Sequence, residues 1–279
     1  MSEVLFAPFA FPFMQNAFLI CLLVAIPTAL LSCFLVLKGW ALMGDAISHA
    51  VLPGIVLAFL AGIPLLIGAF VAGMFCAIAS GYLSDNSRVK EDTVLGVVFS
   101  GMFGLGLVLY ASVDTNVHLD HILFGNLLGV DQFDLLTTGM ISTAISALIF
   151  LKWKDILLHS FDPIQAKASG LPVLIIHYGL LAAISLTVVA TLSAAGLILA
   201  IGLLITPGAI AYLISRSFAK MILTAIATNL CAMLGGVYLS FFIDSAPAPT
   251  IILVLTVLFV IAFVFKMWRT KRASSQVFG

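Results

Sequence analysis

The stretch ASGLPVLIIHYGLLAAISLTVVATLSAAGLILAIGLLITPGAIAYLIS, residues 168–215, runs for 48 residues without an Asp, Glu, Lys or Arg. A membrane-spanning helix needs about 20 predominantly apolar residues, so this stretch is long enough for two. The tetrapeptide Ser193-Ala194-Ala195-Gly196 lies in its middle and predicts the break between them. The fold class follows from this pattern, which is typical of paired helices that cross a membrane.

The rest of the chain has the same composition. Of its 279 residues, 63% are hydrophobic and only 9% are charged, whereas soluble domains carry about 25% charged residues. The uncharged stretch 46–84 predicts a second helix pair, divided at residues 61–64, Ala-Gly-Ile-Pro. Pro8 and Pro12 make the first span the weakest and suggest a prefix that lies at the membrane interface.

Over the whole chain, the pattern predicts an all-α, polytopic membrane helix bundle with eight or nine spans, forming a single transmembrane domain over residues 1–279. The predicted spans are 14–37, 40–60, 64–83, 93–113, 134–151, 172–193, 196–214, 220–242 and 250–267.

The basic residues predict the orientation of the bundle. On the map of alternating spans, every basic residue falls on one side, which the positive-inside rule assigns to the cytoplasm. The N-terminus is then outside and the C-terminus inside, in a cytoplasmic (inner) membrane. The net charge is zero and there is no basic tract, so a nucleic acid is not an expected partner. The basic residues are Lys38, Arg88, Lys90, Lys152, Lys154, Lys167, Arg216, Lys220, Lys266, Arg269, Lys271 and Arg272.

Residues 44–54, GDAISHAVLPG, bring two ionisable side chains into an apolar span. Asp45 and His49 are four residues apart and therefore share a helical face, with Ser48 beside them. An ionised residue at the centre of a span costs about 2.5–3.5 kcal/mol on insertion scales, and such residues usually face a bundle interior or a wet cavity. Carboxylate and imidazole are suitable ligands for Mn, Fe(II) or Zn. We predict a metal passage site, to which a second chain would add another Asp and His.

The same pair fits two other roles. Asp45 and His49 could bond each other or a neighbouring helix and only lock the packing, or they could relay protons in a proton-coupled secondary transporter. The spacing alone does not separate metal from proton. An intramembrane metalloprotease would need a HExxH-like ligand set, and neither His159 nor His177 has a matching acidic pattern.

Two further segments carry candidate site residues. Residues 117–130, VHLDHILFGNLLGV, are too short for a span and place His118, Asp120 and His121 on the outer side, on a helix that lies on the surface or dips into it. We expect an ordinary interfacial helix; a weak metal site or a contact with a binding protein is the alternative. Thr206 and Pro207 predict a kink, because proline removes a backbone hydrogen bond. The kink could face the pathway or serve packing alone.

The longest predicted cytoplasmic segment is 152–171. Asp162 can cap a short helix with Pro163 at its first position. That helix would run from Ile164 to Ser169 and stop at Gly170, a fitting residue for the left-handed C′ position. It could dock on a cytoplasmic partner or merely join two spans.

Five segments, taken together, resemble the metal-type permease subunits of bacterial ABC importers for manganese, iron and zinc, most strongly the manganese/iron permeases of Gram-negative bacteria. They cover most of the chain in order, and their combination is specific. The segments are LVLKGWALMGDAISHAVLPGIVLAFL at 35–60, KEDTVLGVVFSGMFGLGLVLY at 90–110, HLDHILFGNLLGV at 118–130, FDPIQAKASGLP at 161–172 and GLILAIGLLITPGAIAYLI at 196–214.

The resemblance implies a type II ABC importer-like fold and an ATP-driven importer. Its membrane subunits would pair as a homodimer or as a heterodimer with a related permease. Two cytoplasmic ATPase subunits, which bind the ATP, would dock on a coupling helix that falls on Asp162–Gly170 and includes Pro163 and Ala166. A periplasmic or lipid-anchored binding protein would deliver the metal. In relatives, the Asp and His of the GDAxSHA motif lie in the translocation pathway, and these positions match Asp45 and His49.

The chain itself is not expected to be an enzyme. It has no GxxxxGK[ST] loop, so ATP hydrolysis belongs to the separate subunit. No permanently bound cofactor is expected; the metal is the transported substrate. Because Asp and His suit manganese, iron and zinc alike, the sequence does not choose among them.

Overall fold

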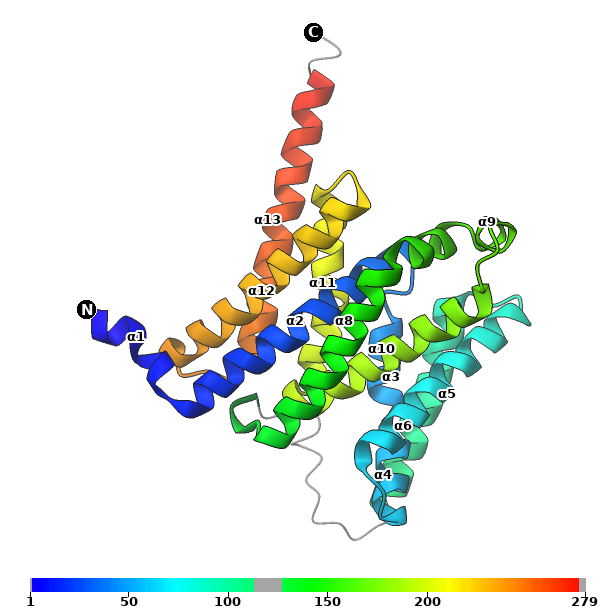
Figure 1. Cartoon of the computed structure of the whole chain (residues 1–279), viewed down its shortest axis with the longest axis horizontal. Coiled ribbons are helices and arrows are strands. Elements are labelled where there is room, and N and C mark those ends of the chain that lie inside the picture. Colours follow the sequence, from blue (N-terminus) through cyan, green and yellow to red (C-terminus); the bar gives the residue numbers. More distant parts are fainter. Residues whose placement is uncertain (1, 113–126, 276–279) are drawn as a thin grey trace.

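The computed structural model describes residues 2–112 and 127–275, and in these ranges nine segments are long and apolar enough to cross a membrane (Figure 1). The elements are α1 (Ser2–Ala10), α2 (Pro12–Lys38), α3 (Met43–Ala50), α4 (Leu52–Ala61), α5 (Leu65–Asp85), α6 (Glu91–Ala111), η1 (Leu127–Gly129), α8 (Gln132–Phe161), α9 (Pro163–Ala168), α10 (Val173–Ala195), α11 (Leu197–Ile214), α12 (Phe218–Ile243) and α13 (Pro247–Ser275).

The breaks expected inside the two long uncharged stretches are confirmed. Gly62 ends α4 with a left-handed φ of 67°, and Gly196 separates α10 from α11 with φ 86° and ψ 168°. Both conformations favour glycine, which has no Cβ to clash. Near the N-terminus, the prefix forms its own helix α1, because Phe11 is extended before Pro12 begins α2. The prefix that the two prolines suggested is thus the short helix α1, and its place at the membrane interface stays a prediction.

Two of the predicted spans differ from the helices that contain them. The span expected at 134–151 belongs to α8, which continues to Phe161, so the first half of segment 152–171 is helix. No helix breaker occurs before Asp162, which is held extended by the proline that follows it. The span expected at 40–60 begins at Met43 and is interrupted at Val51, where α3 gives way to α4. Pro53 explains the interruption, because its ring removes a helical hydrogen bond.

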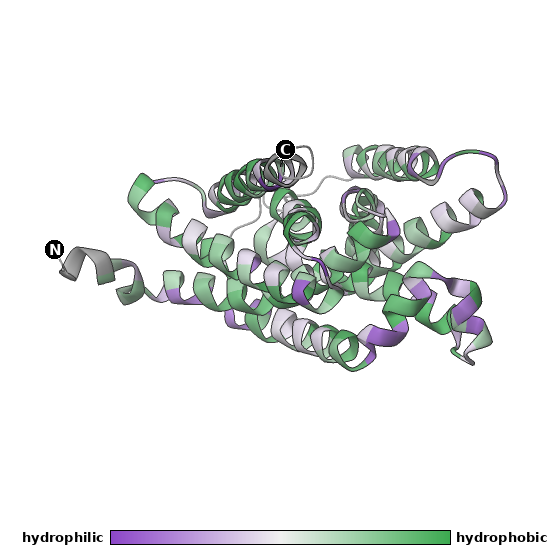
Figure 2. Ribbon diagram, turned by 90° about the horizontal axis from the view of Figure 1, so that it is seen from above, coloured by the Kyte–Doolittle hydropathy of each residue, from purple (hydrophilic) through white to green (hydrophobic). Residues whose placement is uncertain are grey.

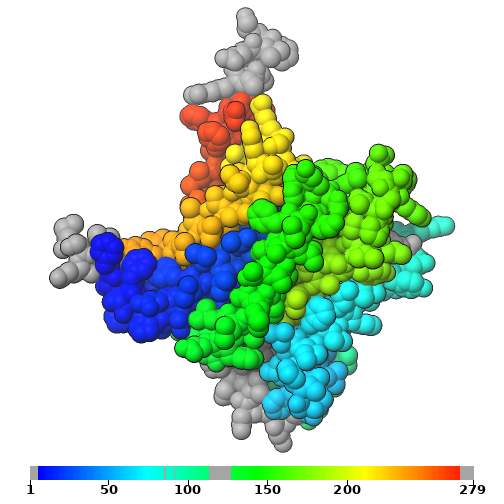
Figure 3. Space-filling model, viewed as in Figure 1, coloured from blue at the N-terminus to red at the C-terminus, as the bar shows by residue number. Residues whose placement is uncertain are grey.

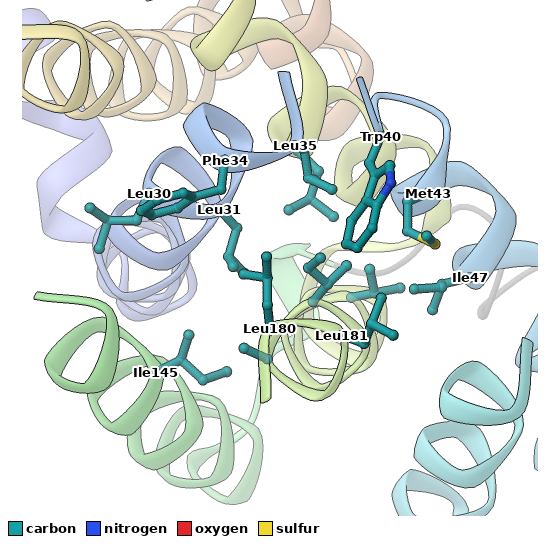
Figure 4. Close-up of a cluster of buried hydrophobic side chains, with 14 of the residues drawn as sticks. Leu30, Leu31, Phe34, Leu35, Trp40, Met43, Ile47, Ile145, Leu180 and Leu181 are labelled. Atoms are coloured by element: carbon teal, nitrogen blue, oxygen red, sulfur yellow. The ribbon is translucent and has the colours of Figure 1, made fainter. Parts of the chain in front are cut away.

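The core surrounds α2, which contacts α8, α11 and α12. Figure 4 shows side chains from α2, α3, α8 and α10 meeting in one apolar cluster. Phe34 and Leu31 of α2 are fully buried there, as is Leu181 of α10. Trp40, in the turn between α2 and α3, closes the cluster at 8% exposure. This packing fixes the position of α3, on which the candidate site lies.

The outer surface is apolar, as expected for a protein in lipid. Figure 2 shows hydrophobic residues along most of the helix surfaces, and Figure 3 shows α8 lying across the viewed face between α2 and α10. Leu151 of α8 is 82% exposed and Leu223 of α12 is 74% exposed. In water such residues would be an aggregation hazard, whereas hydrocarbon solvates them well. The exposed surface therefore agrees with a multi-pass membrane protein.

Candidate functional site

A tight turn after α2 positions the site helix α3. Gly39 has a left-handed φ of 72°, and the backbone N–H of Trp40 donates to the carbonyl of Leu35 at 2.8 Å. This is the pattern of a Schellman motif, which ends a helix and redirects the chain. After this turn the chain enters the bundle as α3, which packs against α5, α6, α10 and α11.

Asp45 and His49 face each other along α3, as their spacing predicts. The Nε2 atom of His49 lies 3.3 Å from Oδ1 of Asp45, and the two side chains are 27% and 31% exposed. Asp45 belongs to the first turn of α3, where the helix dipole favours a negative charge. The third polar residue of the motif does not join them, because the buried Ser48 hydroxyl donates to the carbonyl of Gly44 at 2.7 Å.

Two phenylalanines of α6 form a wall beside the imidazole. The ring centroid of Phe103 lies 5.2 Å from that of His49, edge to face, and that of Phe99 lies 5.9 Å away in a stacked arrangement. The Nδ1 atom of His49 is buried and has no hydrogen-bond partner in the described part of the chain. Of the two ring nitrogens, Nε2 is the one that lies near Asp45. The sequence reasoning missed these residues, although two aromatics four apart in one span were a usable signal.

Pro53 removes one backbone hydrogen bond from this part of the helix. A proline has no N–H, so Pro53 cannot donate to the carbonyl of His49 four residues earlier. That carbonyl lies at the α3–α4 interruption, where the backbone passes through Val51. It accepts a hydrogen bond from the backbone N–H of Val51, two residues later. The motif contains this proline, but the sequence reasoning did not use it.

The geometry of the pair suits a first-row divalent metal. With metal–ligand bonds of about 2.1 Å, adjacent ligand atoms lie about 3.0 Å apart in an octahedral shell and about 3.4 Å apart in a tetrahedral one. The observed 3.3 Å between Nε2 and Oδ1 falls in this interval. In the part of the chain that the structure describes, no group of three or more His, Cys, Asp or Glu residues could hold a metal. Within the described residues, Asp45 and His49 are thus an incomplete ligand set for a metal.

The predicted kink residues lie at the contact between α11 and α2. Pro207 is buried inside α11, which stays helical through it, and Thr206 is half-buried. The backbone N–H of Gly208 donates to Ser32 Oγ at 2.8 Å, and the Ser32 hydroxyl donates to the carbonyl of Ile205 at 3.2 Å. Two hydrogen bonds to Ser32 thus join α11 to α2 beside Pro207. A role in the pathway for Thr206 and Pro207 stays a prediction.

The short helix expected after Asp162 is present. The Asp162 carboxylate accepts hydrogen bonds from the backbone N–H groups of Ile164 and Gln165 at 3.0 and 2.9 Å, and Pro163 is the first helical residue. Gly170 is the C′ residue, with a φ of 79°. The helix α9 spans Pro163–Ala168, one residue earlier than predicted.

The contacts of α9 with the rest of the chain are few. Ala166 is its one fully buried side chain, whereas Ile164 is 82% exposed. Immediately before the helix, Phe161 is 67% exposed. Figure 1 shows α9 at the end of the bundle. The apolar side chains of Ile164 and Phe161 are uncovered there.

The third candidate group, His118, Asp120 and His121, lies outside the described residues. The nearest described part is η1, whose Leu127 is buried and is followed by Val130. The carbonyl of Val130 accepts a hydrogen bond from Asn16 Nδ2 at 3.3 Å, so this end of the segment is tied to α2.

Comparison with known proteins identifies the family. The ABC 3 transport family matches residues 10–266. The chelated iron transport system membrane protein YfeD of Yersinia pestis is 54% identical over 258 residues, covering 92% of this chain and 87% of that protein. The manganese transport system membrane protein MntB of Synechocystis is 45% identical over 257 residues, covering 92% and 84%. The structure of PsaBC from Streptococcus pneumoniae in complex with Fab matches with a TM-score of 0.84 at 38% identity, covering 94% of this chain and 95% of that chain. By sequence and by fold, this chain belongs to the ABC 3 transport family.

Proposed function

We propose that this chain is the permease subunit of an ATP-driven importer for a divalent transition metal, with Asp45 and His49 as ligands in the passage. The observation that carries the proposal is the 3.3 Å approach of His49 Nε2 to Asp45 Oδ1 on a partly exposed face inside the bundle. Manganese and iron are the favoured cargoes, because relatives are named as manganese and iron transport proteins. Zinc is the third candidate, since the same ligands bind it.

The incomplete ligand set supports a pairing of two permeases. Each chain supplies one carboxylate and one imidazole, and two chains meeting at α3 would supply four ligands. Such a site holds the metal without thiolate, which favours release as well as binding. The partner would be a second copy or a related permease. The basic residues support an orientation with the N-terminus outside the cell and the C-terminus in the cytoplasm.

The proposed coupling to ATP runs through α9. A short helix capped by Asp162 and ended by Gly170 is stiff enough to transmit a push, and its exposed Ile164 can enter a groove of an ATPase subunit. Movement of α9 would pass directly to α8 and α10, with which it is in contact. The helices would then rock and change which side of the membrane reaches Asp45 and His49. His118, Asp120 and His121 are proposed as an interfacial contact on the entrance side, where a binding protein would deliver the metal.

Transport by the reconstituted complex tests the site. Vesicles containing the permease, its ATPase and its binding protein are assayed with manganese, iron(II) and zinc for the wild type, Asp45→Asn and His49→Gln. We expect each variant to lose at least about 100-fold in uptake, since even outer-shell partners of a metal ligand contribute 10- to 100-fold. Asp155→Asn is the matched control, because it removes a carboxylate that pairs with Lys152 on the exposed part of α8.

Normal uptake in both site variants would show that Asp45 and His49 are not ligands. Uptake by vesicles that lack the ATPase would instead favour a proton-coupled secondary transporter, the alternative use of the same pair. Both results are read only for variants that still assemble with the ATPase.

The coupling role of α9 has its own test. Asp162→Ala removes two hydrogen bonds to the backbone and should destabilise the helix end by about 1 kcal/mol, whereas Asp162→Asn keeps the cap. We expect the alanine variant to lose transport-coupled ATP hydrolysis while metal binding to the permease stays unchanged. Equal ATP hydrolysis in both variants would contradict the assignment of α9.

A further inference from the structure

A basic groove lies between α11 and α13, at the end of the bundle that carries α9. It encloses about 240 Å³ and is lined by Leu213, Ile214, Arg216, Phe265, Lys266, Arg269 and Thr270. Its residues come from two parts of the chain about 50 positions apart. Figures 1 and 3 show these two parts side by side, the turn after α11 in yellow and α13 in red.

The local structure holds the three cations of the groove together. Lys266 and Arg269 lie three residues apart on α13 and therefore share a face. Arg216 sits in the three-residue turn between α11 and α12, where the neighbouring Ser215 hydroxyl lies 3.2 Å from that of Thr224 on α12. This contact restrains the turn, and Arg216 lines the groove together with residues of α13.

Nothing in the described part of the chain neutralises these charges. The ion pairs there are Asp45 with His49 and Lys152 with Asp155, and neither involves the groove. Three cations that line one groove repel one another, and an anion bound in the groove would relieve that repulsion. Arginine is especially suited to phosphate, because its guanidinium can donate two parallel hydrogen bonds.

The walls of the groove indicate where the anion comes from. Phe265 is 56% exposed and Ile214 is 40% exposed, so apolar surface continues from the cations along the span. Trp268 on α13 and Tyr212 on α11 are 64% and 57% exposed. Exposed Trp and Tyr at the end of a span mark the level of the lipid headgroups. The groove therefore combines phosphate-binding cations with an apolar floor at the depth where a phospholipid presents both parts.

We propose that this groove binds the headgroup phosphate of an anionic phospholipid, with Arg216, Lys266 and Arg269 on the phosphate and an acyl chain along Phe265. The lipid joins the end of α11 to α13. Basic pockets between spans on the cytoplasmic side are a common means of holding anionic lipids. The leaflet concerned is the cytoplasmic one in the orientation proposed above, but the binding itself does not depend on the transported substrate.

Native mass spectrometry of the full-length chain tests the proposal. The purified protein is titrated with phosphatidylglycerol or with phosphatidylcholine of the same acyl chains. Each cation near an anionic lipid contributes about fivefold in affinity, so Arg216→Gln/Lys266→Gln/Arg269→Gln should weaken phosphatidylglycerol binding by about 100-fold. The matched control Arg88→Gln/Lys154→Gln/Lys220→Gln removes three charges outside the groove and should change binding by less than threefold. A variant with Arg216→Lys and Arg269→Lys keeps the charge and should retain most of the binding.

Several outcomes would overturn the proposal. Equal binding of phosphatidylcholine would show that the groove does not select an anionic headgroup. Displacement of phosphatidylglycerol by inorganic phosphate at the same concentration would assign the groove to free phosphate. Loss of lipid on addition of the ATPase, together with loss of ATPase binding in the triple variant, would make it a subunit interface. If the lysine variant loses binding as fully as the glutamine variant, charge is not the cause.

Discussion

Two sets of polar side chains lie inside the helix bundle, and they differ in how they are bonded. Asp45 and His49 contact each other, remain about 30% exposed and leave Nδ1 of the imidazole without a partner among the described residues. Thr28, Ser32 and Asn229, which we call the polar lock, are completely buried and bridge α2 to α11 and α12. In the lock, Asn229 Nδ2 donates to the carbonyl of Ala25 at 2.9 Å and to the Thr28 hydroxyl at 3.0 Å.

The difference shows how to separate structural from functional polarity in a membrane protein. In hydrocarbon, a polar group must find a partner inside the protein. In the polar lock, the side-chain polar atoms have hydrogen-bond partners, except Oδ1 of Asn229, which has none within the described part of the chain. Among the described residues, Asp45 and His49 meet this requirement with each other alone, and both side chains stay partly exposed, as a site that exchanges its ligands requires. We therefore expect mutations at the pair to affect transport, and mutations in the lock to affect stability.

Exchanging the two site residues gives the largest and most informative effect. The double variant Asp45→Ala/His49→Ala should lose more than about 100-fold in uptake. The swapped variant Asp45→His/His49→Asp keeps both ligand types on one face and should recover at least about tenfold of that loss, because Mn, Fe(II) and Zn accept either order. Uptake in proteoliposomes is the measurement. If the swapped variant is as inactive as the double alanine variant, a carboxylate and an imidazole on this face are not sufficient for transport, and the assignment of the pair as metal ligands fails.

The second-largest effect is expected from adding a methyl group where α11 packs against α2, and it concerns stability. A Cβ at Gly208 would lie 2.6 Å from Ser32 Oγ and would press on the Ser32 backbone. Gly208→Ala should therefore lower the free energy of unfolding by about 1–3 kcal/mol, the usual cost of overpacking. Unfolding in SDS micelles measures it. Gly235→Ala in α12 is the control, since a Cβ there meets nothing within 4 Å. Equal stability of the two variants would contradict the close approach.

Removing the central residue of the lock gives a smaller change. Asn229→Ala breaks two hydrogen bonds between α12 and α2 and should destabilise by about 1 kcal/mol, in the range measured for such bonds in membranes. Metal affinity, measured by equilibrium binding, should stay within about twofold. A large loss of affinity without loss of stability would place Asn229 in the metal pathway instead of the lock.

Ser48 supplies the smallest effect and the sharpest internal control. It lies beside Asp45 and His49 in sequence, yet its hydroxyl bonds to Gly44 in its own helix. Ser48→Ala should change uptake by less than about twofold, because such a bond contributes little to a helix. A strong loss of uptake would show that the serine also touches the metal.

Much of the fold could be predicted because its signals are local. Breaks at Gly62 and Gly196 follow from glycine in the middle of long apolar runs. The α9 helix follows from Asp162, Pro163 and Gly170, whose capping roles depend only on their neighbours. The differences from the predicted spans are local too, because each depends on one proline. Helix α8 continues to Phe161 because the first residue that stops it is Pro163. Helix α3 ends at Ala50 because Pro53 interrupts the hydrogen bonding there, which the prediction did not include.

The sequence by itself determined the membrane class, the sites of the helix breaks and the shared face of Asp45 and His49. Hydropathy, turn chemistry and helical periodicity act within a few residues, so they can be read without a fold. Only the tertiary structure decided that Phe99 and Phe103 lie beside the imidazole, that Ser32 bonds to α11 beside Pro207, and that Arg216 lines the same groove as Lys266 and Arg269. These contacts join helices that are distant in the chain, and a partner or a degree of burial exists only after those helices have packed.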